Sequence, residues 1–308
     1  MSGRRIRALD VARGLAVVAM VVFHLIWDLG HFGYIAASIP WSAPVKAFGH
    51  AIAFSFLFIA GVSLVLAHRE GIDWRAFWRR FAIVAGAAAL VSAGTYIVFP
   101  TAFVFFGILH CIAAASLLSV PFLLLPWPAA LAAGVVFLAA PHVFTAPVFN
   151  SDWLQWVGLS THEPLTQDWR PLFPWAGAML LGVAAARALP LAKVEGARSA
   201  APSKLGGALP FLGRHSLLIY LAHQPALFAL FTGLVIIAPP PEDATAFILD
   251  CTASCRADGG EKAYCHDACV CTAQEAIRSK ALVGVTDEAE RGKRLREIAG
   301  RCVGKGRE

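Results

Sequence analysis

Long apolar stretches, separated by short polar segments, run through the first 237 residues of the chain. A transmembrane helix needs about 20 mostly apolar residues. That length selects stretches over residues 8–29, 47–67, 81–99, 103–120, 128–144, 172–189 and 214–237. The pattern predicts an all-α fold, a polytopic transmembrane helical bundle with about seven spans. Only a short turn with prolines separates the fourth and fifth stretches, so a re-entrant pair is the alternative there.

Basic residues beside these stretches predict the orientation of the bundle, because cytoplasmic flanks carry an excess of Lys and Arg. If the N-terminus is cytoplasmic, the outer loops contain only Lys46 and Arg170. The inner flanks then contain Arg4, Arg5, Arg7, Arg13, Arg69, Arg75, Arg79, Arg80, Arg187, Lys193, Arg198, Lys204 and Arg214. We therefore expect a multi-pass protein of the inner (cytoplasmic) membrane. An odd number of spans then places the C-terminal tail outside, in the periplasm.

The composition supports a lipid environment. Hydrophobic residues make up 58% of the chain and charged residues 15%, and the mean hydropathy is +0.64, which excludes one ordinary soluble domain. The net charge of +6 does not indicate nucleic-acid binding, because most basic residues of the apolar part lie beside hydrophobic stretches. The expected partner is the lipid bilayer. The sequence does not decide whether the protein forms a homo-oligomer.

A polar segment rich in cysteine follows the last apolar stretch. Prolines 239–241 mark the boundary, which predicts a transmembrane domain over 1–237 and an extracytoplasmic tail over 238–308. The tail contains two Cys-x3-Cys pairs, nine residues apart, and residues i and i+4 share one face of a helix. The hypothesis is a small helical hairpin stapled by disulfides, pairing Cys251 with Cys269, Cys255 with Cys265 and Cys271 with Cys302.

Two alternatives compete with this hairpin. The four cysteines of the paired motifs allow three connectivities. A zinc site is the other interpretation, but zinc sites favour gaps of about two to four residues together with histidines. An oxidising outer compartment favours disulfides instead. We therefore expect disulfides and no metal.

A stripe of polar residues runs along one face of the helix predicted for the first apolar stretch. Successive helical residues turn by about 100°, so Asp10, His24, Asp28 and His31 all lie within about 60° of Arg13. Ionisable groups inside a membrane indicate a functional site by default. We interpret His24 as catalytic, with Asp28 one turn away to orient its ring. The alternative is that His24 only hydrogen-bonds a neighbouring helix and that Asp28 and His31 are hydrated at the outer end.

Two further histidines lie well inside predicted spans. His110 and His223 could share an interior substrate cavity with His24, and we add Gln224 and Arg170 of the outer loop to its lining. A single satisfied hydrogen bond would explain His110 or His223 equally well.

Ordered motifs resemble the compact bacterial branch of the heparan-alpha-glucosaminide N-acetyltransferase catalytic-domain family, within the transmembrane acyltransferase superfamily. The opening motif is LDVARGL over residues 9–15, followed by His24. The later motifs are FLFIAG over 56–61, GILH over 107–110, PLFPW over 171–175 and GRHSLLIYLAHQP over 213–225.

This resemblance implies transfer of an acyl group, typically acetyl from cytoplasmic acetyl-CoA, to a sugar amine or hydroxyl. The acceptor would be a carbohydrate or glycolipid of the cell envelope. Arg13 would mark the end of the helix where the CoA moiety docks. His24 would be the catalytic base or the acyl-accepting residue, with His31 as its rival. The resemblance does not cover the cysteine-rich tail.

Two other function classes compete with acyl transfer. A haem-binding redox protein would use the intramembrane histidines, but such proteins usually need paired axial histidines on facing helices. A transporter or flippase would usually show repeat symmetry or paired broken helices, and the sequence shows neither.

Overall fold

The computed structural model describes residues 7–36, 38–189, 207–238, 244–279, 281–282 and 288–304, and within these residues it is helical without a strand ladder. One isolated parallel bridge joins Phe106 and Trp169. Some predictions fall outside the described residues, namely the prolines at 239–241 and the basic residues Arg4, Arg5, Lys193, Arg198 and Lys204.

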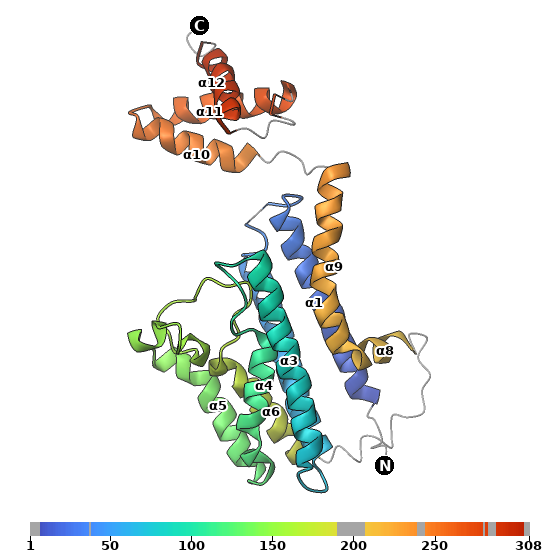
Figure 1. Ribbon diagram of the computed structural model, residues 1–308. Helices are drawn as coiled ribbons and strands as arrows, with labels where there is room; N and C mark the ends of the chain where they lie inside the picture. Colours follow the sequence, from blue (N-terminus) through green and yellow to red (C-terminus); the bar gives the residue numbers. More distant parts are fainter. Residues whose placement is uncertain are drawn as a thin grey trace. The chain divides into compact units, whose positions relative to one another are not determined.

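Among the residues that the structure describes, four helices are long and apolar enough to cross a membrane (Figure 1). They are α1 (Arg7–His31), α2 (Ala43–Ala67), α3 (Trp74–Val98) and α9 (Ser216–Ile237). The other apolar helices are shorter, with 12, 17 and 17 residues. These are α4 (Ile108–Ser119), α5 (Trp127–Val143) and α6 (Leu172–Ala188). The all-α transmembrane bundle is thus confirmed, whereas the number of seven spans and the orientation stay predictions.

The remaining elements of the apolar part are short. The helix α8 (Ala208–Arg214) precedes α9, and three 3-10 turns, η1 (Pro121–Leu123), η2 (Pro147–Asn150) and η3 (Gln155–Val157), lie in the connections. The chain divides into two compact units, one of residues 1–27 and 40–229 and one of residues 28–39 and 230–308. The domain boundary at residue 238 stays a prediction.

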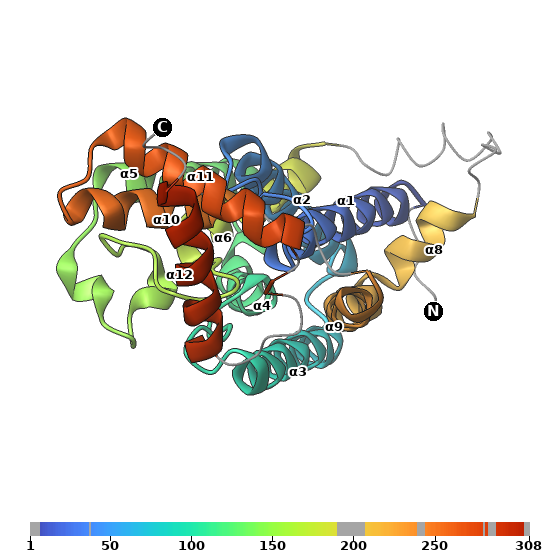
Figure 2. The same cartoon turned by 90° about the horizontal axis from the view of Figure 1, so that it is seen from above.

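Close backbone approach organises the first unit, where α6 packs against α2, α4 and α5 (Figure 2). A Cβ atom on Gly61 of α2 would lie 2.1 Å from the carbonyl oxygen of Met179, and one on Gly182 of α6 would lie 2.1 Å from that of Phe58. In a membrane the hydrophobic effect does not drive helices together, because lipid tails are as apolar as the side chains. Small residues instead let the helices approach closely and gain van der Waals contact. This reciprocal pair of glycines fixes the α2–α6 contact.

Polar capping explains where two helices begin. The α3 helix starts at Trp74, earlier than predicted, because the side chain of Asp73 accepts a hydrogen bond from the Ala76 N–H at 3.0 Å. The α4 helix starts at Ile108, later than predicted, because residues 102–106 run alongside residues 167–170. In that segment the Arg170 N–H donates to the Phe106 carbonyl at 3.1 Å.

The second unit contains the cysteine-rich helices α10 (Ala244–Ala257), α11 (Lys262–Ser279) and α12 (Glu288–Gly304). The α10 and α11 helices pack together, with Gly259 at a φ of +91° in the turn between them. The three predicted disulfides are confirmed, with Cα–Cα distances of 5.9, 5.7 and 5.9 Å: Cys251–Cys269, Cys255–Cys265 and Cys271–Cys302. The location of this unit outside the cell stays a prediction.

Candidate functional site

A buried carboxylate joins three helices at the start of α1. Asp10 is only 5% exposed, and its two oxygens pair with Arg13 Nη1 and Arg214 Nε, each at 3.3 Å. Arg13 Nη2 also donates to the Ser63 hydroxyl of α2 at 2.5 Å. We call Asp10, Arg13, Ser63 and Arg214 the Asp10 cluster. This cluster fixes the direction of the Arg13 guanidinium. Arg13 is the residue that the family resemblance assigns to CoA binding.

The α1 and α8 helices come close enough for this cluster because their backbones touch at glycines. A Cβ on Gly14 would meet the Leu209 carbonyl oxygen at 2.1 Å, and one on Gly213 would meet the Asp10 carbonyl oxygen at 1.8 Å. Sequence reasoning placed Asp10 and Arg13 on one stripe but missed Ser63 and Arg214. The GRHS motif was the signal that could have suggested Arg214.

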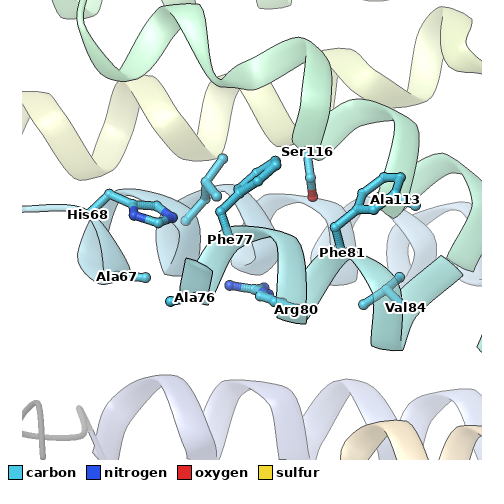
Figure 3. A pocket seen from close by; sticks show the side chains of 10 residues that line it. Ala67, His68, Ala76, Phe77, Arg80, Phe81, Val84, Ala113 and Ser116 are labelled. Carbon is cyan, nitrogen blue, oxygen red and sulfur yellow. The ribbon is translucent and has the colours of Figure 1, made fainter. Parts of the chain in front are cut away.

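A cavity of about 180 Å³ lies between the end of α2, the start of α3 and α4 (Figure 3). Apolar side chains form most of its wall. Figure 3 shows Arg80 and His68 on the α2–α3 side, with Ser116 contributed by α4. Arg80 has no acidic partner within 4 Å among the described residues. It lies within electrostatic range of Arg13.

His68, which lines this cavity, is neutral at pH 7. Its Nδ1 accepts a hydrogen bond from the Asp73 N–H at 3.3 Å, so the proton of the neutral ring resides on Nε2. Burial and the positive charge of Arg80 lower the pKa of His68, and the opposing effect of Asp73 is smaller. The cavity therefore combines one cation with one uncharged hydrogen-bond donor, the His68 Nε2–H, which suits an anionic group on an otherwise apolar ligand.

Two of the predicted site histidines lie in direct contact. The ring centroids of His24 on α1 and His223 on α9 are 4.8 Å apart, with an interplanar angle of 61°. We call them the imidazole pair. Gln224 follows His223 on α9. The sequence predicted only that these histidines share a cavity. In the structure the two rings meet edge to face.

Arg170 is held in place by the loop between α5 and α6. Its guanidinium lies 5.2 Å from the ring centre of Trp175 and 3.6 Å from Asp168 Oδ1, and it lies within electrostatic range of His24. Asp168 Oδ2 in turn accepts from the Ile108 N–H at 2.9 Å, which ties the loop to the first turn of α4. That Arg170 lines a cavity with His24 stays a prediction.

His110 has both ring nitrogens in structural hydrogen bonds. The Gly107 N–H donates to Nδ1 at 3.2 Å, so Nε2 carries the proton and donates to Ser92 Oγ at 3.2 Å. Ser92 then donates to the Val104 carbonyl at 2.6 Å. This geometry favours the structural alternative for His110, a cap on the start of α4.

Asp28 and His31 belong to the second unit, although they continue the helix that carries His24. Asp28 is fully buried, and the His31 ring contacts Phe32 with centroids 5.1 Å apart. Their part in a site with His24 stays a prediction. No group of three or more metal-ligating side chains occurs among the residues that the structure describes.

Comparison with known families decides the classification. The model of the family "Heparan-alpha-glucosaminide N-acetyltransferase, catalytic" matches residues 5–225. The chain belongs to this family. The match includes the Asp10 cluster, the imidazole pair and Arg170, and membership makes the protein an acyltransferase-type membrane enzyme. No curated protein and no solved structure matches the chain.

Proposed function

We propose that this heparan-alpha-glucosaminide N-acetyltransferase relative moves an acetyl group from cytoplasmic acetyl-CoA to a sugar amine or hydroxyl of an envelope glycan or lipid. The observation that carries the proposal is the imidazole pair, in which His24 of α1 contacts His223 of α9. The Arg13 guanidinium on the same helix as His24 is oriented by Asp10 and Ser63. The family match supports acetyl transfer, and the envelope acceptor follows from the proposed location in the inner membrane.

The donor would be held at the Arg13 end of α1. Coenzyme A carries several phosphate charges, and guanidinium groups bind phosphates through paired hydrogen bonds. Arg13 is oriented by Asp10 and Ser63, while Arg80 is a second cation beside an apolar cavity. His24 lies eleven residues further along α1, about 16 Å at the helical rise. The long pantetheine arm of the donor would bridge that separation and bring the thioester to the imidazole pair.

In this proposal His24 is the central catalytic imidazole. A neutral imidazole can take a proton from an attacking amine or hydroxyl, or accept the acyl group and pass it on. Asp28, one turn further along α1, would hold the productive tautomer of His24, and His31 is the rival for the reactive position. Arg170 and Gln224 would line the acceptor side of the cavity.

Neither competing function class gains support. Haem coordination by two histidines requires the iron and porphyrin plane between the rings, whereas His24 and His223 touch with centroids 4.8 Å apart. A transporter would need a mobile pathway, and no observation on the described residues points to one.

Isotopic acetyl transfer tests the proposal. Membranes containing the parental protein are incubated with [14C]acetyl-CoA and either glucosamine or an envelope glycan extract from the same cells. We expect labelled acetyl-amide or acetyl-ester product that membranes lacking the protein do not form. Absence of transfer to both acceptors, with no binding of CoA by the purified protein, would refute the proposed function.

A further inference from the structure

The ring nitrogens of His223 are used in different ways. Nδ1 lies 2.7 Å from the carbonyl oxygen of Tyr220 and 3.2 Å from that of Ile219. A carbonyl oxygen only accepts hydrogen bonds, so Nδ1 carries a proton and donates it. In the neutral ring Nε2 is therefore the unprotonated nitrogen, and its lone pair is the basic site.

Nε2 of His223 is buried, and none of the described residues supplies it with a hydrogen bond. Leaving a buried acceptor unpaired costs about 1–3 kcal/mol, so a position that keeps one calls for an explanation. The ring lies against His24, the imidazole that the proposed function places at the centre of the site. A substrate N–H or O–H placed there would supply the missing donor.

The carbonyl that orients His223 belongs to a well-packed part of α9. Tyr220, with Leu217 and Leu221, packs against Ala87 and Ala88 of α3 and Leu109 of α4. Packing of this kind holds the backbone turn that presents the Tyr220 carbonyl. A hydrogen bond from one ring nitrogen fixes the tautomer and raises the basicity of the other.

The other two predicted site histidines lack this arrangement. Both nitrogens of His110 are engaged in capping α4, so that ring has no lone pair left for a substrate. The His24 ring has contacts with Phe23 and His223, but no orienting hydrogen bond to it occurs in the described part of the chain. Among these histidines, the geometry for accepting a proton is found at His223.

We propose that His223 is the general base of the acyl transfer, an inference that rests on the proposed function. As the acceptor oxygen or nitrogen bonds to the acyl carbon, its proton passes to Nε2 of His223. The carbon–sulfur bond of the thioester then breaks, and the proton moves from Nε2 to the leaving thiolate. The imidazolium formed in between is stabilised by the Tyr220 carbonyl on Nδ1.

The test compares two matched substitutions. His223→Asn removes the basic nitrogen but keeps an N–H that can donate to the Tyr220 carbonyl. His215→Asn is the control, because His215 has the same kind of contact, Nδ1 to the Phe211 carbonyl at 2.9 Å, but is exposed. Rates of [14C]acetyl transfer to glucosamine are measured across pH, and the affinity for CoA is measured in the same preparations.

General bases contribute about 10²–10⁴-fold to such rates. We expect the turnover of His223→Asn to fall by a factor in that range, while its affinity for CoA stays parental. The ratio of parental to variant rate should fall as pH rises, because hydroxide replaces the missing base. The titratable neighbours of the ring, His24 and Tyr220, stay unchanged in both variants. The His215→Asn variant should behave like the parent.

Three outcomes would overturn the inference. Parental turnover by His223→Asn would show that no base is needed there. Loss of CoA binding together with turnover, or a rate ratio that is constant across pH, would show a structural role only. Each of these leaves the proposed function standing, provided that the parent transfers acetyl. If the parent neither transfers acetyl nor binds CoA, the proposed function fails and the assignment of His223 falls with it.

Discussion

Gly61→Ala should destabilise the bundle by separating α2 from α6. The added Cβ would lie 2.1 Å from the Met179 carbonyl oxygen, whereas ordinary contact begins at 3.4 Å, so the helices must move apart by the difference of about 1.3 Å. Overpacking of this kind costs about 1–3 kcal/mol. For a chain of this size each kcal/mol lowers Tm by about 2–4 °C. The expected shift is therefore about 2–12 °C downward.

A thiol-reactive fluorescent dye provides the assay, since Cys111 is buried and lies outside the three disulfides. Its labelling during heating in detergent reports the unfolding of the first unit. Gly86→Ala in α3 is the matched control, because a Cβ there meets nothing within 4 Å. Replacing this helical glycine should stabilise the protein by about 0.5–1 kcal/mol. A Gly61→Ala protein that melts at or above the parental temperature would refute the α2–α6 packing described above.

The remaining predictions concern the tail, the topology and the donor site. Mass analysis of oxidised and reduced protein should differ by six hydrogens, two for each of three disulfides, and stoichiometric zinc on free thiols would contradict this pairing. Reporter fusions after residue 72 should behave as cytoplasmic and those after 160 and 245 as exported; an exported signal at 72 would overturn the orientation. Arg13→Ala should raise the KM for acetyl-CoA more than it lowers kcat, because Arg13 is proposed to bind phosphate. An unchanged KM would remove Arg13 from the donor site.

Patterns local in sequence predicted most of the fold. Each predicted apolar stretch contains a helix, because burial in lipid forces the backbone to satisfy its hydrogen bonds internally. The disulfide pairing was also predictable, since Cys-x3-Cys on two packed helices allows the facing sulfur atoms to meet. The predicted start of α4 was wrong by several residues, because the Asp168 carboxylate that caps Ile108 lies sixty residues away in the sequence.

The candidate site was only partly predictable for the same reason. The stripe on α1 correctly placed Asp10 and Arg13 on one face, but the Arg214 that pairs with Asp10 lies 204 residues along the chain. In the sequence His24 stood out through the stripe on its helix, but His110 and His223 could not be told apart. Their roles diverge through hydrogen bonds to the backbone, at Gly107 for His110 and at Tyr220 for His223, and residue identity alone does not specify such contacts.

The rate of [14C]acetyl transfer by His24→Ala tests whether an imidazole on α1 carries out acetyl transfer. The substitution removes the ring that contacts His223 while alanine preserves the helix. We expect transfer to be abolished, with expression and membrane insertion near parental, and His31→Ala to keep activity. A dead His31→Ala beside an active His24→Ala would move the reactive position to His31. Parental rates in both variants would contradict histidine-based catalysis on this helix.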